Sequence, residues 1–142
     1  MSAFAADEDF VKKAAMGGIA EVDAGKLAQQ KGDSDAVKQF GAQMVADHSR
    51  TNDELKQIAT SKKMTVPTET DPAHKAAEKK LEAKSGAAFD QAFKAQMVAD
   101  HKATITLFER EAKNGSDSDL RAFAAKTLPG LQEHLKMAQA LK

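Results

Sequence analysis

Cysteine, tryptophan and tyrosine are absent from the sequence, and proline occurs only three times. Without cysteine, the chain can form no disulfide and can bind no metal ion through thiolate sulfur. No apolar run approaches the roughly 20 residues that a transmembrane helix requires, so the sequence predicts no membrane span. Neither charge dominates, because 21 basic residues balance 21 acidic ones. This balance argues against nucleic acid as a partner, since proteins that bind nucleic acid normally carry a basic excess.

The residues that are present fit one helical domain. The chain has 142 residues, of which 42% are hydrophobic and 30% are charged, as in ordinary globular proteins of this size. Alanine and lysine are abundant and favour helix. We therefore predict a single all-α domain over residues 7–142, either a monomer or a weak dimer. The sequence identifies no protein partner.

The first six residues are predicted to lie outside this domain, as a disordered remnant. Ala3 and Ala5 form the small-residue pattern that precedes a signal-peptidase cleavage site. The pattern indicates an exported protein, with the periplasm as the expected location. The alternative is a disordered alanine-rich segment without a targeting role.

Apolar residues at three- and four-residue spacing predict four long helices. Their expected ranges are 7–30, 35–63, 87–113 and 118–141. Gly32 and Gly115 each follow one of these helices, at the position where glycine commonly ends a helix. Asp71 and Pro72 predict the start of a short helix between the second and third long helices. The pattern is typical of a four-helix bundle with a short extra helix in a crossover segment.

The segment Gln-Met-Val-Ala-Asp-His occurs twice, at residues 43–48 and 96–101. The alignment extends from Phe40–Ala59 onto Phe93–Ala112 at a constant shift of 53 residues. In both copies the methionine and the histidine are four residues apart, which puts them on the same, core-facing side of a helix. We interpret the two copies as a duplication of one unit.

The length of the crossover segment predicts how the helices run. The 22 residues from Thr65 to Gly86 are too many for a tight turn and long enough to return along the bundle. The second and third long helices then run parallel. In that arrangement four polar core residues fall within one layer about 10 Å deep: Glu21, His48, His101 and His134. A tight turn would instead separate Glu21 and His134 by about 12 Å in height.

Three imidazoles and one carboxylate in one layer suit a divalent transition metal ion. Zinc fits these donors best, and iron, copper, nickel and manganese also accept them. We therefore predict a metal site formed by Glu21, His48, His101 and His134, in a protein that stores, buffers or senses the ion. The alternative is a Glu–His hydrogen-bond network without metal, in a structural or stress-related interaction module. The sequence shows no catalytic motif.

Residues beside the predicted site each have two interpretations. Asp47 and Asp100 precede the repeated histidines and are either hydrogen-bond partners of the site or solvated neighbours, of which we favour the second. Met44 and Met97 lie one helical turn from those histidines and are either thioether ligands or core-filling side chains, and the second is far commoner. His74 lies among the charged residues of the short helix and is expected to be exposed.

Three motifs occur together in the chain: Phe-x-x-x-Met-Val-x-Asp-His twice, Ser85-Gly86-Ala87-Ala88-Phe89-Asp90 before the second copy, and Leu128-Pro129-x-Leu131-x-x-His134-Leu135 near the end. Their combination resembles a bacterial family of exported proteins of unknown function, which are often labelled outer membrane proteins and are classed as ferritin-like. The resemblance extends from Phe10 to Leu141. It implies a ferritin-like bundle and an exported location, but it implies no activity.

The chain departs from the iron-oxidising ferritin-like proteins, which carry Glu-x-x-His pairs on two helices. Three positions before the predicted histidine ligands stand Val45, Val98 and Leu131. Only Glu21 supplies a carboxylate on the core-facing side. A carboxylate-bridged di-iron centre is therefore not expected.

Overall fold

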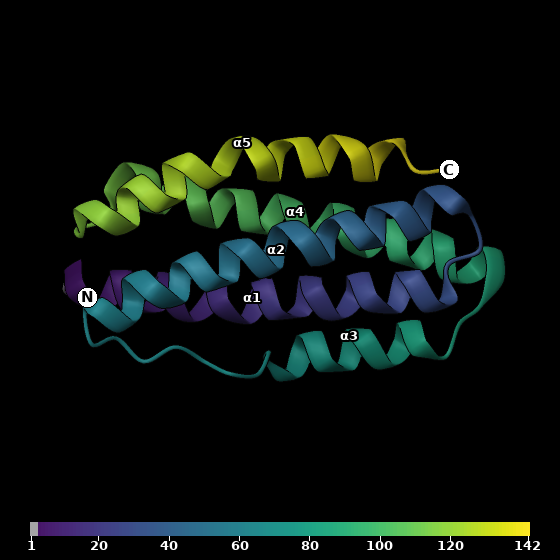
Figure 1. The fold of residues 1–142 in the computed structure, drawn as a ribbon, viewed down its shortest axis with the longest axis horizontal. Coiled ribbons are helices and arrows are strands. Elements are labelled where there is room, and N and C mark those ends of the chain that lie inside the picture. The colour runs from purple at the N-terminus through teal and green to yellow at the C-terminus, as the bar shows by residue number, and fades with distance from the viewer. Residues whose placement is uncertain (1–2) are drawn as a thin grey trace.

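The computed structural model describes residues 3–142, and over this range the chain is helical without a β-strand. Its five helices are α1 (Ala3–Lys31), α2 (Asp35–Ser61), α3 (Pro72–Glu82), α4 (Gly86–Asn114) and α5 (Ser118–Ala140). The four long helices lie side by side as a bundle, and α3 lies along the outside of α1 (Figure 1). The prediction of an all-α protein is confirmed.

The helix boundaries agree with the sequence prediction to within a few residues, except at the N-terminus. There, α1 begins at Ala3, four residues before the predicted start. Residues 3–6, which we expected to be disordered, are therefore part of a helix, and the high helix propensity of alanine explains the difference. Residues 1 and 2 of the expected disordered segment lie outside the described residues.

Short polar side chains begin three of the helices. Ser34 accepts a hydrogen bond from the backbone N–H of Val37 at the start of α2. Asp117 accepts one from the N–H of Leu120 at the start of α5, and Asp71 caps α3 in the same way. These contacts satisfy amides that have no partner within the helix. The positions of the turns are therefore determined locally by the sequence.

The long helices alternate in direction around the bundle. The pair α1 and α2 forms an antiparallel hairpin, and so does the pair α4 and α5 (Figure 1). The segment after α2 returns along the bundle through α3, so α2 and α4 run in the same direction, as the length of the crossover predicts. Helix α1 also packs against α4, and α2 packs against α5.

The two hairpins correspond to each other at a constant distance along the sequence. Helices α1 and α4 both have 29 residues. Their first residues are 83 positions apart, and so are the first residues of α2 and α5. This correspondence differs from the 53-residue shift between the two copies of the repeated segment. One copy therefore lies in the second helix of its hairpin, and the other copy lies in the first helix of its own.

Each hairpin closes the turn of the other through one buried carboxylate. Asp90 of α4 accepts hydrogen bonds from the backbone N–H groups of Asp33 and Ser34, both at 2.9 Å, in the turn between α1 and α2. Asp7 of α1 accepts two bonds, of 3.1 and 2.9 Å, from the corresponding residues of the turn between α4 and α5. Buried amides without a partner are costly. The two carboxylates therefore hold the hairpins in register with each other.

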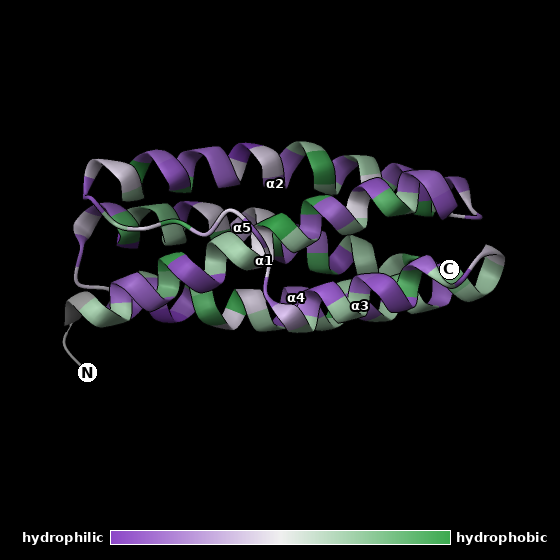
Figure 2. Cartoon of the chain, turned by 90° about the horizontal axis from the view of Figure 1, so that it is seen from below, coloured by the Kyte–Doolittle hydropathy of each residue, from purple (hydrophilic) through white to green (hydrophobic). Residues whose placement is uncertain are grey.

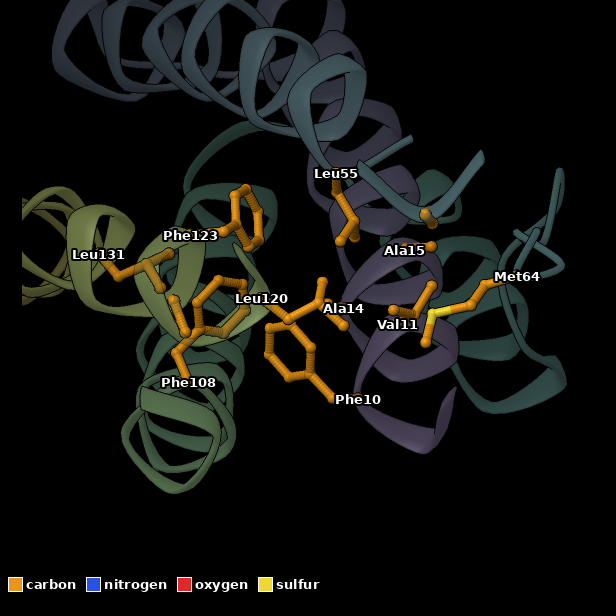
Figure 3. Packing of buried hydrophobic residues seen from close by; sticks show 12 residues of the cluster. Phe10, Val11, Ala14, Ala15, Leu55, Met64, Phe108, Leu120, Phe123 and Leu131 are labelled. Atoms are coloured by element: carbon orange, nitrogen blue, oxygen red, sulfur yellow. The ribbon is translucent and has the colours of Figure 1, made fainter. Parts of the chain in front are cut away.

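Two apolar clusters fill the bundle. The Phe10 cluster (Figure 3) consists of Phe10, Val11, Ala14, Ala15, Leu55, Ala59, Met64, Phe108, Leu120, Phe123, Ala124 and Leu131. The Phe93 cluster consists of Ala24, Leu27, Ala28, Val37, Phe40, Met44, Leu81, Phe89, Phe93, Met97, Ala138 and Leu141. In the first cluster Phe10 meets Phe108 edge to face, with ring centroids 5.0 Å apart, a favourable aromatic geometry.

Hydrophilic and hydrophobic residues alternate along every helix, as the two colours in Figure 2 show. This alternation lets each long helix turn one side to the core and another to solvent. None of the described helices combines the length and the apolar character that crossing a membrane requires.

A second buried acid, Glu111 of α4, lies beside Asp7 at the end of the bundle that holds the α4–α5 turn. Burial, and then the hydrogen bond and charge of the neighbouring Asp7, raise the pKa of Glu111 to about 8. Glu111 is therefore a neutral acid at pH 7. In that form it can donate a hydrogen bond to the Asp7 carboxylate, which in turn accepts hydrogen bonds from the two turn amides.

We expect the stability of the protein to fall as the pH rises towards 8. The pKa of Glu111 is about 8 in the folded state and near 4.5 in the unfolded state, so the folded state binds more protons between these values. Urea unfolding at about pH 6 and about pH 8.5 measures this dependence. The difference between wild type and Glu111→Gln isolates Glu111, because the other groups titrate in both proteins. An unchanged pH dependence in Glu111→Gln would contradict the assignment.

Candidate metal centre

The four predicted site residues lie between the two apolar clusters. Along each long helix, one of them separates residues of the Phe10 cluster from residues of the Phe93 cluster. Glu21 does so in α1, His48 in α2, His101 in α4 and His134 in α5. All four side chains are buried, with 1–6% of their residue surface exposed. The bundle thus contains a polar layer to which each long helix contributes one residue.

The structure brings three of these residues, the histidine triad His48, His101 and His134, into mutual contact. Their ring centroids are 5.3–5.7 Å apart. One ring nitrogen from each lies within 4.8 Å of the other two. Nitrogens bound to one tetrahedral zinc ion are about 3.4 Å apart. Small movements of the rings would therefore bring all three nitrogens to a common ion.

Hydrogen bonds fix the orientation of two of the three rings. The Nδ1 atom of His101 donates to the carbonyl oxygen of Met97, one turn earlier in α4, at 2.8 Å. The Nε2 atom of His134 donates to the Asp47 carboxylate across the α2–α5 contact, at 2.7 Å. In each ring the second nitrogen is left for a different contact. Such an outer hydrogen bond is what commonly orients a metal-binding histidine.

One nitrogen of each triad ring is buried without a hydrogen-bond partner in the part of the chain that the structure describes. These atoms are Nε2 of His48, Nε2 of His101 and Nδ1 of His134. A buried polar atom left unpaired costs about 1–3 kcal/mol. Three such atoms from three helices in one layer are more than isolated core histidines would leave.

Two rings of the triad have a lowered pKa, which suits metal ligands because these must be unprotonated. Burial, followed by the neighbouring histidines, lowers the pKa of His48 to about 3. Burial also lowers the pKa of His101 to about 4. Both rings are therefore neutral at pH 7 and keep a lone pair for a ligand. Protonation of one ring would place a positive charge beside the other two rings. This repulsion adds to the effect of burial on the pKa of His48.

Glu21, the fourth predicted residue, lies beside the triad but not among the ligand atoms that converge. Its carboxyl oxygen is 4.0 Å from Nδ1 of His101, the nitrogen that already donates to Met97. Burial, and then the nearby Asp100 carboxylate, raise the pKa of Glu21 well above its usual value. Burial therefore favours the protonated form of Glu21, whose carboxyl group lies against that of Asp100.

The preference for Asp47 and Asp100 as solvated neighbours is wrong, because both contact residues of the polar layer. Although burial acts to raise it, hydrogen bonds from Gln43 and His134 hold the pKa of Asp47 below its usual value. Asp100 contacts Glu21 and, at 4.0 Å, His74 of α3, and no histidine of the triad. The two aspartates precede equivalent histidines in the sequence. Their partners differ because α2 and α4 have different neighbours at this height.

The other side chains with two interpretations are resolved by burial. Met44 and Met97 are fully buried in the Phe93 cluster, as expected of core-filling side chains. His74 is half-buried rather than exposed, because its Nδ1 atom contacts the Asp71 carboxylate at 2.6 Å and its Nε2 atom faces Asp100 at 4.0 Å. It lies in α3 and is not part of the triad.

The triad lies next to an open cavity, although its unpaired nitrogens are themselves buried. A cavity of about 280 Å³ between α2 and α5 is lined by His48 and His134, together with charged residues at its rim. His101 does not line it. A small molecule or ion in this cavity would therefore lie against two of the three triad residues.

A family model described as a domain of unknown function (DUF4142) matches residues 1–141. No curated protein and no solved structure shows a match to the chain. The comparisons therefore support the expected kinship with a family of unknown function, and they assign no activity to the site.

Proposed function

The chain belongs to the DUF4142 family of unknown function, and we propose from the site itself that it is a metal-binding helical bundle. His48, His101 and His134 hold one divalent transition metal ion. The protein stores, buffers or senses that ion. Two observations carry this proposal: one ring nitrogen from each of the three histidines lies within 4.8 Å of the other two, and each ring has one buried nitrogen without a hydrogen-bond partner among the described residues.

A divalent ion would satisfy all three nitrogens at once. The lone pairs come from neutral imidazoles, which bind zinc, copper, nickel and iron. Asp47 supports the assignment because its carboxylate orients His134, in the arrangement usual for zinc-bound histidine. Zinc is the ion we propose first, since it accepts three histidines with a fourth position left open.

Glu21 has a different role in this proposal from the one predicted. Its nearest triad atom is Nδ1 of His101, which is engaged by Met97. Its carboxyl group lies against that of Asp100, and the raised pKa of Glu21 limits the repulsion between the two acids. We therefore assign it to the support of the site rather than to the ligand set.

We also propose that the fold is ferritin-like. The parallel course of α2 and α4, joined by a long crossover, supports this classification. Export to the periplasm stays a prediction from the N-terminal sequence pattern.

The proposal is tested by unfolding the metal-free protein, prepared without a histidine tag, in the presence and absence of zinc. A ligand that binds only the folded state stabilises it by about 2.7 kcal/mol when its free concentration is 100 times Kd. We expect a zinc-dependent increase in the free energy of unfolding that saturates at one ion per chain.

The matched control is the same titration with magnesium, which prefers oxygen ligands and should have no effect. If zinc, copper, nickel, cobalt and iron all leave stability unchanged, the metal site does not exist. In that case the polar layer is a metal-free network, as in an interaction module.

A further inference from the structure

We propose that the metal ion in the histidine triad keeps one open coordination position, and that a small monoanion entering through the α2–α5 cavity binds there. This inference rests on the proposed function and adds to it the chemical class of a second ligand. A closed structural zinc site has four protein ligands, whereas a site that exchanges ligands has three. The triad supplies three nitrogens.

The position of the cavity determines which side of the ion is open. His48 and His134 form part of the cavity wall, and His101 approaches from α4 without lining it. Glu21 faces the Nδ1 atom of His101, away from the nitrogen that the triad leaves unpaired. The remaining coordination position is therefore reached from the cavity, where the structure provides space for a ligand.

The cavity exists because α5 has little side-chain bulk at this height. Gly130 lines it, and a Cβ atom built on Gly130 would meet no atom within 4 Å. Thr127, one turn earlier, turns its hydroxyl back to the carbonyl oxygen of Phe123 at 2.7 Å. Neither residue therefore projects a polar group that would fill the open position.

Charge favours an anion as the second ligand. Imidazole binds a metal ion as an uncharged ligand, so three histidines would leave the ion its double positive charge. At the cavity rim, Arg50 and Lys126 pair with Asp47 and Glu54, each at 2.7 Å. Two positive charges thus balance two negative ones, so the rim does not repel an anion. A volume of about 280 Å³ has room for a small anion, since one water molecule takes up about 30 Å³.

Azide binding to the cobalt-loaded protein tests the inference. Cobalt(II) replaces zinc in nitrogen sites, and its visible absorption changes when a ligand exchanges. We expect azide to change the absorption of the wild-type cobalt protein with saturation. In Gly130→Leu, the added side chain fills the cavity, and we expect the azide-dependent change to be lost while cobalt still binds. Gly17→Leu is the matched control, because Gly17 of α1 also has free space at its Cβ position and does not line the cavity.

The outcomes separate this inference from the proposed function. Failure of the wild-type protein to take up cobalt would overturn this inference, and failure with zinc, copper, nickel and iron as well would overturn the proposed function. Cobalt uptake without any azide effect would overturn the open position alone. An azide effect that is equal in wild type, Gly130→Leu and Gly17→Leu would show that azide does not enter through the cavity, and would overturn the assignment to it.

Discussion

Replacing His101 by alanine is expected to weaken zinc binding by more than about 100-fold, because groups that only orient a metal ligand already contribute up to that factor. His101 is the most buried member of the triad, with 1% of its surface exposed. The hydrogen bond to Met97 fixes its ring, so it contributes a preoriented donor. Alanine removes one of three nitrogens and puts no donor in its place. Competition with a chromogenic chelator measures the zinc Kd.

His74→Ala is the control for this experiment. This variant removes the chain's only histidine outside the triad. In the wild type, the His74 ring is held by Asp71, the residue that caps α3. We expect wild-type zinc affinity in this variant. His101→Phe adds a second test, because it keeps a ring of similar volume in the core and still lacks a donor. Wild-type affinity in both His101 variants would contradict the triad as the ligand set.

Replacing Asp90 by alanine is expected to lower the free energy of unfolding by about 3 kcal/mol, because hydrogen bonds to charged groups contribute about 1.5–3 kcal/mol each. The Asp90 carboxylate accepts two of them from successive amides of the α1–α2 turn. The side chain is buried, with 7% of the residue exposed. In the variant both amides lose their partner. Urea denaturation of the metal-free protein measures the loss.

Two further variants separate this mechanism from a general effect of removing a charge. Asp53→Ala removes an exposed acid of α2, and we expect a change within about 0.5 kcal/mol. Asp90→Asn keeps one oxygen as an acceptor and should lie between wild type and Asp90→Ala. If Asp90→Ala were no less stable than Asp53→Ala, the carboxylate would not hold the turn.

The helices and the layer could be predicted from the sequence because both depend on spacing along the chain. Ser34 and Asp117 cap the helices where the turn residues indicate, since capping is a local contact. The height of a residue in the bundle follows from its distance to a turn at about 1.5 Å per residue. His48 and His134 could therefore be assigned to one height, although 86 residues separate them.

The contacts within the layer could not be predicted, because they depend on how each helix is rotated about its axis. Height alone assigned Glu21 to the ligand set, whereas its side chain faces Asp100 and the engaged nitrogen of His101. Asp47 of α2 contacts His134 of α5, and spacing within α2 cannot reveal a partner on another helix. The occurrence of aspartate before both repeated histidines was the available signal. It indicated that these positions matter, but not what they contact.

Each hairpin supplies the carboxylate that binds the turn of the other hairpin, and this has a consequence for how the molecule folds. The amide that Asp7 satisfies is 110 positions away along the chain, and the one that Asp90 satisfies lies 57 positions away. Each hairpin can form its own helices early. The amides of its turn, however, find their hydrogen-bond acceptor only on the other hairpin. Neither half is thus an autonomous folding unit. The assembly of the two halves, and with it the histidine triad drawn from both, becomes a single cooperative event.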